Sequence, residues 1–215
     1  MFCPVTCETE ATMASADPAG AAAVTREELD STAQRERRRR IVDATLSLAR
    51  KGGYDAVQMR AVAKKADVAL GTLYRYFPSK IHLLVAGLVR EFERAEERLD
   101  KAPIPGDTAK ERLLFVLERN TQMMQRAPLL TEAMVRAFMF ADATAASEVE
   151  TVGRLLESMF ARAIGDAEPT PRQRDAFHLI ADVWMANLVA WVTHRASAAD
   201  VQKRLAITVD LVIDD

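Results

Sequence analysis

The sequence predicts an all-α protein of about nine helices. Apolar residues recur at spacings of three and four along most of the chain, and no segment shows the strict alternation of a half-buried strand. Helix breakers are few, with eight Gly and eight Pro among 215 residues. A chain of this length forms one or two domains, each large enough to bury its own core without disulfides or metal ions.

The N-terminal segment differs from the rest of the chain. Residues 1–33 are rich in Ala, Thr, Ser, Pro and acidic residues without periodicity, which predicts a disordered arm. Its two cysteines, Cys3 and Cys7, have no histidine nearby, so free thiols in a reducing cytosol are favoured over a metal site. We therefore expect the folded part of the chain to begin near Gln34.

The first predicted helix runs from Gln34 to Gly52. Four consecutive arginines occupy residues 37–40. The apolar stripe that follows consists of Ile41, Ala44, Thr45, Leu48 and Ala49. Gly52 and Gly53 then favour a left-handed cap. The arginines suit phosphates as partners, although a solvated face would explain any single one of them.

Two short helices are predicted next. Asp55 followed by Gln58 marks the first, because a carboxylate and an amide three residues apart can satisfy the free N–H groups of a first turn. After an interruption at residues 66–68, a second helix begins, and Pro78 ends it. Its buried stripe consists of Leu70, Leu73 and Phe77, and its opposite side presents Gly71, Thr72, Tyr74, Arg75 and Tyr76. This layout is that of a helix-turn-helix that reads DNA.

Charge is distributed unevenly along the chain. Residues 34–80 contain 12 Lys and Arg against four acidic residues, a balance of +8. Because the whole chain carries −2, the remainder carries −10. A basic segment beside an acidic body fits a protein that binds DNA phosphates at one end and another partner elsewhere, although a chance cluster of solvated charges is the alternative.

The residues of this predicted DNA-binding domain, residues 34–80, have different expected roles. Gln58 and Arg60 stand at the start of their helix, where they can meet a phosphate or a groove edge. Gly71 has no side chain and lets the backbone approach the bases. Leu70 offers an apolar contact to a thymine methyl group, which leaves hydrogen-bond readout mainly to Thr72 and Arg60.

Residues 70–80, Leu-Gly-Thr-Leu-Tyr-Arg-Tyr-Phe-Pro-Ser-Lys, resemble the signature of the TetR family of one-component bacterial repressors. The resemblance covers residues 34–90 and implies a homodimer that binds a palindromic operator in double-stranded DNA. The residues that it implies as phosphate contacts are Thr72, Tyr74, Tyr76 and Lys80. Tyr74 has an alternative role, since an aromatic ring there can pack against the first helix. Ala69 departs from the family, which often has Ser or Thr there, so one helix cap or phosphate donor is missing.

A fourth helix links the two parts of the chain. Ser79 caps it, and it becomes highly charged after Val89, as expected of a partly exposed connector. We expect residues 81–101 to form this connecting helix and residues 102–215 to form an effector-binding and dimerisation domain. Capping signals and apolar stripes predict further helices at residues 108–125, 128–140, 144–164, 170–194 and 197–212.

No pattern in the sequence predicts catalysis, a cofactor or a metal site. His82 and His194 are expected to be solvated residues at helix ends, and His178 to be a satisfied core histidine. The Ser-His-Asp, Cys-His and Gly-rich phosphate-loop spacings of enzymes do not occur. No apolar run reaches the roughly 18 residues of a membrane helix, so we expect a cytoplasmic protein with no membrane partner.

The C-terminal domain is rich in Met and aromatic residues, which suit a lining that adapts to a large apolar ligand. The residues expected to seat such an effector are Phe115, Met123, Met124, Phe138, Trp184 and Met185. Asn187 is available to bind a keto oxygen. An ordinary core is the alternative role for any single one of these residues.

Three segments resemble a branch of the family that represses cholesterol catabolism in actinobacteria. They lie at residues 128–134, 141–149 and 182–191. This resemblance implies a steroid catabolite or its coenzyme A thioester as effector and sterol-degradation genes as targets. A fatty acyl-CoA or a drug is the alternative effector. A helical carrier that binds no DNA is the alternative class of protein.

The helix predicted at residues 170–194 is apolar on two sides. One face consists of Trp184, Leu188, Trp191 and Arg195, and the other of Leu179, Val183, Ala186, Ala190 and Thr193. Such a helix needs both a core and a second subunit to cover it. Together with the last helix, it would form the four-helix interface of a two-fold dimer.

Overall fold

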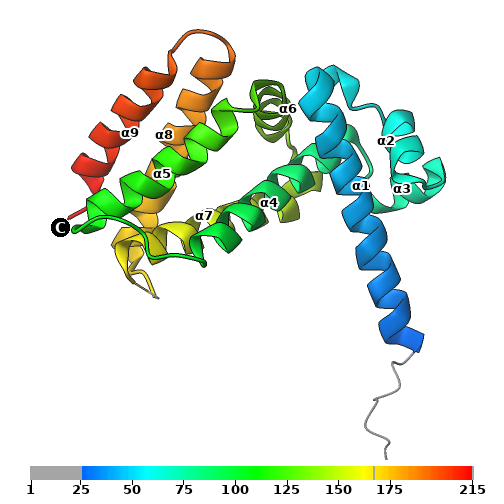
Figure 1. The fold of residues 1–215 in the computed structure, drawn as a ribbon, viewed down its shortest axis with the longest axis horizontal. Helices are drawn as coiled ribbons and strands as arrows, with labels where there is room; N and C mark the ends of the chain where they lie inside the picture. Colours follow the sequence, from blue (N-terminus) through cyan, green and yellow to red (C-terminus); the bar gives the residue numbers. More distant parts are fainter. Residues whose placement is uncertain (1–25, 167, 215) are drawn as a thin grey trace, which may run out of the picture.

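The structure is a computed structural model that describes residues 26–166 and 168–214. Over these residues it contains nine α-helices, one short 3-10 helix and no strand, which confirms the all-α prediction (Figure 1). The elements are α1 (Arg26–Ala56), α2 (Met59–Ala66), α3 (Leu70–Tyr76), α4 (Lys80–Leu99), α5 (Ala109–Gln125), α6 (Pro128–Met139), η1 (Ala143–Ala145), α7 (Ala146–Ile164), α8 (Pro171–Val192) and α9 (Ala198–Val212). None of these described helices combines the length and the apolar composition that a bilayer crossing requires.

The first helix is longer than its sequence pattern indicates. α1 begins at Arg26 instead of Gln34, so the predicted disordered arm is wrong for its last residues, while residues 1–25 lie outside the described part of the chain. Residues 31–33 of the added part are exposed, and Arg35 contacts two of them: its Nε donates to the carbonyl oxygen of Ser31 at 3.4 Å and its Nη2 to Oγ1 of Thr32 at 3.3 Å. Because residues 31–33 bury no face, they show no apolar stripe in the sequence.

A glycine pair bends the chain between α1 and α2. Gly53 has a φ of 65° and a ψ of −158°, a conformation that residues with a side chain rarely adopt. The chain turns there and forms one more helical turn, through Ala56, before α2 begins at Met59. The predicted helix start at Asp55 is therefore wrong, and Gln58 occupies the N-cap position without a side-chain hydrogen bond.

α1, α2, α3 and the start of α4 pack around one core. Its fully buried members include Ile41, Val57, Val62, Leu73 and Phe77. Between α2 and α3, Asp67 has a left-handed φ of 53° and lets the chain reverse. The guanidinium of Arg38 lies 5.2 Å from the centre of the Phe77 ring, which adds a cation–π contact at the base of α3. α2 and α3 are thereby held beside each other on α1 (Figure 1).

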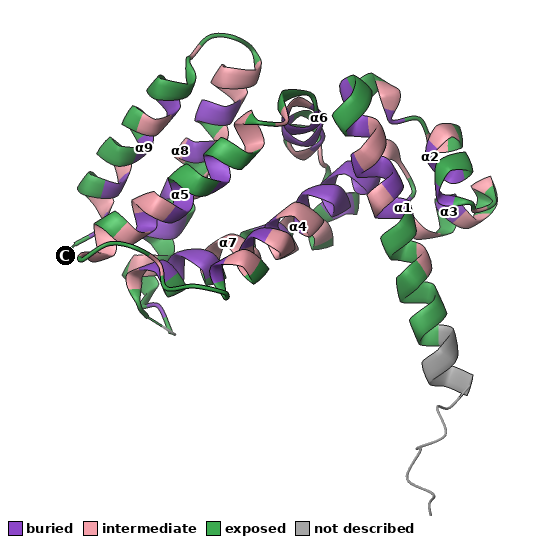
Figure 2. Ribbon diagram, in the orientation of Figure 1, coloured by how far each residue is buried: buried purple, intermediate pink, exposed green. Residues whose placement is uncertain are grey.

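α4 extends from this core to the remaining helices (Figure 1). Its inner side is buried from Leu83 to Leu99, where it packs against α1, α6 and α7 (Figure 2). Side-chain caps open several helices as predicted, namely Ser79 for α4, Thr108 for α5, Thr170 for α8 and Ser197 for α9. The division of the chain into domains at α4 stays a prediction.

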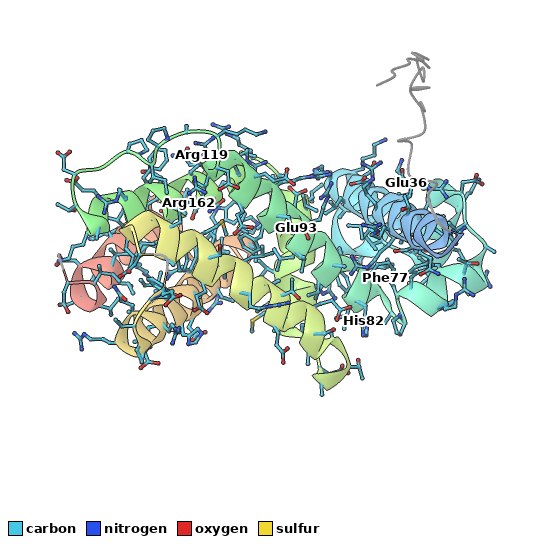
Figure 3. The ribbon with its side chains drawn as sticks, turned by 90° about the horizontal axis from the view of Figure 1, so that it is seen from below. Glu36, Phe77, His82, Glu93, Arg119 and Arg162 are labelled. Carbon is cyan, nitrogen blue, oxygen red and sulfur yellow. The ribbon has the colours of Figure 1, made fainter. Side chains whose placement is uncertain are left out.

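Two of the three predictions for the histidines are wrong. His82, near the start of α4 (Figure 3), is buried: its Nδ1 lies 3.0 Å from Oγ of Ser79 and its Nε2 lies 3.1 Å from the carbonyl oxygen of Thr144. His178 is exposed on α8 instead of lying in the core, and His194 is exposed as predicted. The helical pattern could not show that η1 folds back onto the first turn of α4.

Candidate nucleic-acid interface and apolar cavity

α2 and α3 carry the side chains predicted to contact DNA. The exposed members are Gln58, Arg60, Gly71, Tyr74 and Arg75, and the half-buried members are Leu70, Thr72 and Tyr76. Tyr74 exposes 48% of its surface, which argues against its alternative role of packing on α1. Leu70 packs partly against the core, so only part of its side chain is free to contact a base.

Gly71 lies in the first turn of α3 and is not required there by the fold. A Cβ atom built on Gly71 meets no other atom within 4 Å, and the backbone has no left-handed φ. Glycine inside a helix costs about 0.5–1 kcal/mol relative to alanine. The protein therefore carries a destabilising residue on an open helix surface, which is understandable if a partner comes close to the backbone.

Lys80 does not extend freely from the surface. Its Nζ donates a 3.2 Å hydrogen bond to the carbonyl oxygen of Tyr54 and lies 3.8 Å from the centre of the Tyr54 ring. The guanidinium of Arg136 on α6 lies 4.2 Å from the same ring. The charge of Lys80 therefore lies at a joint between α1, α4 and α6, and its phosphate contact stays a prediction.

An apolar cavity of about 360 Å³ lies between the helices of the larger part of the molecule. Its lining comes from Leu88 and Phe92 of α4, Met124 of α5, Thr131, Met134, Val135 and Phe138 of α6, Val149, Val152, Gly153 and Leu156 of α7, and His178, Ala181, Asp182, Trp184, Met185 and Leu188 of α8. The volume falls in the range of about 300–1,000 Å³ that is usual for small-molecule sites. We refer to this space as the apolar cavity.

Four of the seven predicted ligand residues line the apolar cavity, namely Met124, Phe138, Trp184 and Met185. The other three do not line it. Phe115 is half-buried against the core outside the cavity, and Met123 is 40% exposed beside a separate groove. Asn187 is buried between α8 and α9, where its Nδ2 donates to the carbonyl oxygen of Val183 (2.7 Å) and its Oδ1 accepts from Arg204 (3.3 Å).

Polar atoms are few in the deep part of the apolar cavity. The hydroxyl of Thr131 donates to the carbonyl oxygen of Met124 at 2.7 Å and is thereby satisfied. Nε1 of Trp184 is buried and has no hydrogen-bond partner among the described residues. Since a buried donor without an acceptor costs about 1–3 kcal/mol, a ligand oxygen near this indole would remove that cost.

The described residues contain no group of three or more His, Cys, Asp and Glu that could hold a metal ion, and Cys3 and Cys7 lie outside them. What they do contain is a basic two-helix unit joined by α4 to an apolar cavity. A surface that can meet DNA and a space that can hold a small apolar molecule are therefore built on one continuous helix.

Known proteins resemble the chain over most of its length. The family described as "Bacterial regulatory proteins, tetR family" matches residues 41–86, and the family described as "Tetracyclin repressor-like, C-terminal domain" matches residues 106–212. The transcriptional repressor KstR of Mycolicibacterium smegmatis is 60% identical over 89% of this chain and 94% of its own. KstR of Rhodococcus jostii is 60% identical over 91% of both chains. A crystal structure of a TetR transcriptional regulator from Rhodococcus sp. RHA1 superimposes with a TM-score of 0.74 at 31% identity, covering 84% of this chain and 97% of that one.

Proposed function

Since this chain belongs to the TetR family and is a TetR-type transcriptional repressor, we propose that it binds a palindromic operator as a homodimer and is released by an apolar effector. The observation that carries this proposal is the position of α4. Its inner side contributes Leu88 and Phe92 to the wall of the apolar cavity, and its N-terminus follows the recognition helix α3 after only three residues. A ligand in the cavity therefore presses on the helix that positions α3.

The DNA-binding role of α2 and α3 is supported by their exposed polar residues and by the basic charge of residues 34–80. We assign phosphate and groove contacts to Gln58, Arg60, Thr72, Tyr74, Arg75 and Tyr76. Gly71 and the free part of Leu70 form the edge that meets the bases. This assignment leaves hydrogen-bond readout mainly to Thr72 and Arg60.

A DNA-binding titration tests this role. We expect a fragment that contains an inverted repeat from upstream of the protein's own gene to bind about a thousandfold more tightly than random DNA. Both affinities should fall with salt, with a log–log slope of about −0.9 per phosphate contact. Equal affinity for the two fragments at every salt concentration would instead favour a helical carrier whose basic segment is only a solvated surface.

The homodimer is supported by an apolar surface on α8 and α9. The large exposed side chains are Leu179 (53% exposed), Ile207 (51%) and Leu211 (78%). The two helices are antiparallel, because Arg172 pairs with Asp214 at 3.2 Å and Arg204 donates to Asn187 at 3.3 Å. Leu179 therefore lies level with residues 207–211. We propose that a second copy covers this surface and places the two recognition helices about 34–36 Å apart, one turn of DNA.

Leu211→Glu is expected to convert the dimer into a folded monomer. The side chain is 78% exposed in the single chain, so the charge costs little there, but in the interface it would be buried without a partner at about 3 kcal/mol or more. Sedimentation equilibrium at micromolar concentration measures the change. Phe140→Glu is the matched control and should remain a dimer, because Phe140 directly follows α6 and is 70% exposed. If Leu211→Glu stays dimeric, the dimer interface does not include Leu211.

The effector class that we propose is a steroid catabolite or its coenzyme A thioester. Support comes from the resemblance to the cholesterol-catabolism branch, the identity to the KstR repressors and the apolar lining of the cavity. With Asn187 turned toward α9, Nε1 of Trp184 is the donor that we propose for a keto oxygen. A fatty acyl-CoA is the competing effector and should be titrated alongside.

The switch that we propose has two mechanical links. α4 connects the cavity wall directly to α3, as described above. α6 lines the cavity with Thr131, Met134 and Phe138, while its Arg136 holds the ring of Tyr54 at the end of α1. A ligand that displaces α4 or α6 changes how α1 and α3 sit on the connecting helix, and so changes the spacing of the two recognition helices.

A further inference from the structure

The apolar cavity opens to solvent between α7 and α8. Of all the residues that line it, the exposed ones are Gly153 on α7 and His178 and Asp182 on α8. The lining residues from α4 and α6 are buried, except for the half-buried Phe138, and are apolar apart from the satisfied Thr131. The side between α7 and α8 is therefore the most exposed part of the cavity lining.

A polar groove begins where the cavity ends. It has a volume of about 570 Å³ and is lined by Ser147, Glu150, Thr151, Gly153, Arg154, Glu157 and His178. Gly153 and His178 line both the groove and the apolar cavity. The two spaces therefore adjoin at these two residues, which we call the threshold, with an apolar chamber on one side and polar side chains on the other.

Gly153 has no evident role in its own helix. It lies inside α7, its φ is not left-handed, and a Cβ atom built on it meets nothing within 4 Å. Alanine there would stabilise the helix by about 0.5–1 kcal/mol. The space above Gly153 is the threshold itself, so the missing side chain leaves the passage open.

We propose that this threshold is the portal of the effector site and that Gly153 keeps it open for a ligand with an apolar body and a long polar tail. The proposal rests on the proposed function, because it assumes that the effector occupies the apolar cavity. The groove offers hydrogen-bonding partners to such a tail. Glu157 is already paired with Arg174 at 3.2 Å. Arg154 donates to the hydroxyl of Thr151 at 2.9 Å, and within residues 26–166 and 168–214 no carboxylate forms an ion pair with it. Glu150 is the opposing charge in the groove.

Stopped-flow fluorescence of Trp184, in a Trp191→Phe background, tests the portal with two probes. One probe is the coenzyme A thioester of a 3-oxosteroid acid, and the other is androst-4-ene-3,17-dione, which has no tail. Gly153→Leu should slow association of both probes at least about tenfold, because the added side chain would fill the open space at the threshold. It should also weaken the affinity of the thioester by a similar factor and leave that of the tailless steroid nearly unchanged.

The control is Ala146→Leu, at the exposed start of α7 and outside both spaces, which should bind both probes like the unaltered protein. The portal proposal is overturned if the unaltered protein binds the probes and Gly153→Leu binds them with the same association rates and affinities.

A covalent label distinguishes failure of the effector hypothesis from failure of the portal proposal. If the unaltered protein binds neither probe, the proposed effector class is wrong. The threshold can then still be tested with a fluorescent bimane attached at Gly153→Cys, in a protein whose Cys3 and Cys7 are replaced by Ser. Blue-shifted emission that Trp184 quenches supports a passage into the apolar cavity. Emission like that of a bimane at Ala146→Cys, which faces solvent, overturns it.

Discussion

Replacing Gly71 by leucine is expected to reduce operator binding to the level of random DNA, a loss of roughly a thousandfold or more. The added side chain meets no atom of the protein itself, so it would occupy the space between α3 and the bases. The fold should survive, because leucine in a helix is about 0.5–1 kcal/mol more favourable than glycine. Titration of operator and random fragments, together with thermal unfolding, measures both effects.

The matched control for this variant is Gly153→Leu. It places the same side chain on another helix, again where a Cβ atom meets nothing within 4 Å. Gly153→Leu should retain operator affinity and bind the steroid thioester more weakly, whereas Gly71→Leu should lose operator affinity and retain effector binding. If Gly71→Leu folds and binds the operator with unchanged affinity, α3 does not lie in the DNA groove.

Effector binding is expected to lower operator affinity about 100-fold, which corresponds to a coupling of about 2.7 kcal/mol. The physical reason is that packed helices around the apolar cavity move as units when a bulky ligand enters, and two of them, α4 and α6, contact the DNA-reading part of the chain. Fluorescence anisotropy of labelled operator, titrated with a steroid thioester or a fatty acyl-CoA, measures the release for each ligand class.

Variants of Tyr54 examine the α6 link in the same assay. Tyr54→Leu removes the ring that Lys80 and Arg136 contact and leaves two positive charges without it, so the release should become smaller. Tyr54→Phe keeps the ring and should respond like the unaltered protein. Equal release in the two variants would show that α4 transmits the effect without α6.

The recognition unit was predictable because several local signals agreed. Leu73 and Phe77 are fully buried as their spacing indicated, and α3 ends before Pro78. The caps at Thr108, Thr170 and Ser197 also act within one turn of their own helices, so sequence spacing alone reveals them.

Features that depend on how helices are rotated against each other were not predictable. Trp184 and Asn187 are three residues apart on α8, yet one lines the apolar cavity and the other bonds to Arg204 of α9. Leu88 and Phe92 looked like ordinary core residues, because nothing in their periodicity shows that the neighbouring space is empty. The partner of Lys80 is 26 positions away in the chain, beyond the reach of any helical pattern.

Calorimetry tests the central claim, that one ligand site and one DNA site are coupled through this fold. The steroid thioester is titrated into the free protein and into its complex with operator. Linkage requires operator to weaken ligand binding by the same factor by which ligand weakens operator binding, so the dissociation constant should be about 100-fold higher in the complex. Equal affinity for the two forms would mean that the ligand, however tightly it binds, does not release this repressor from DNA.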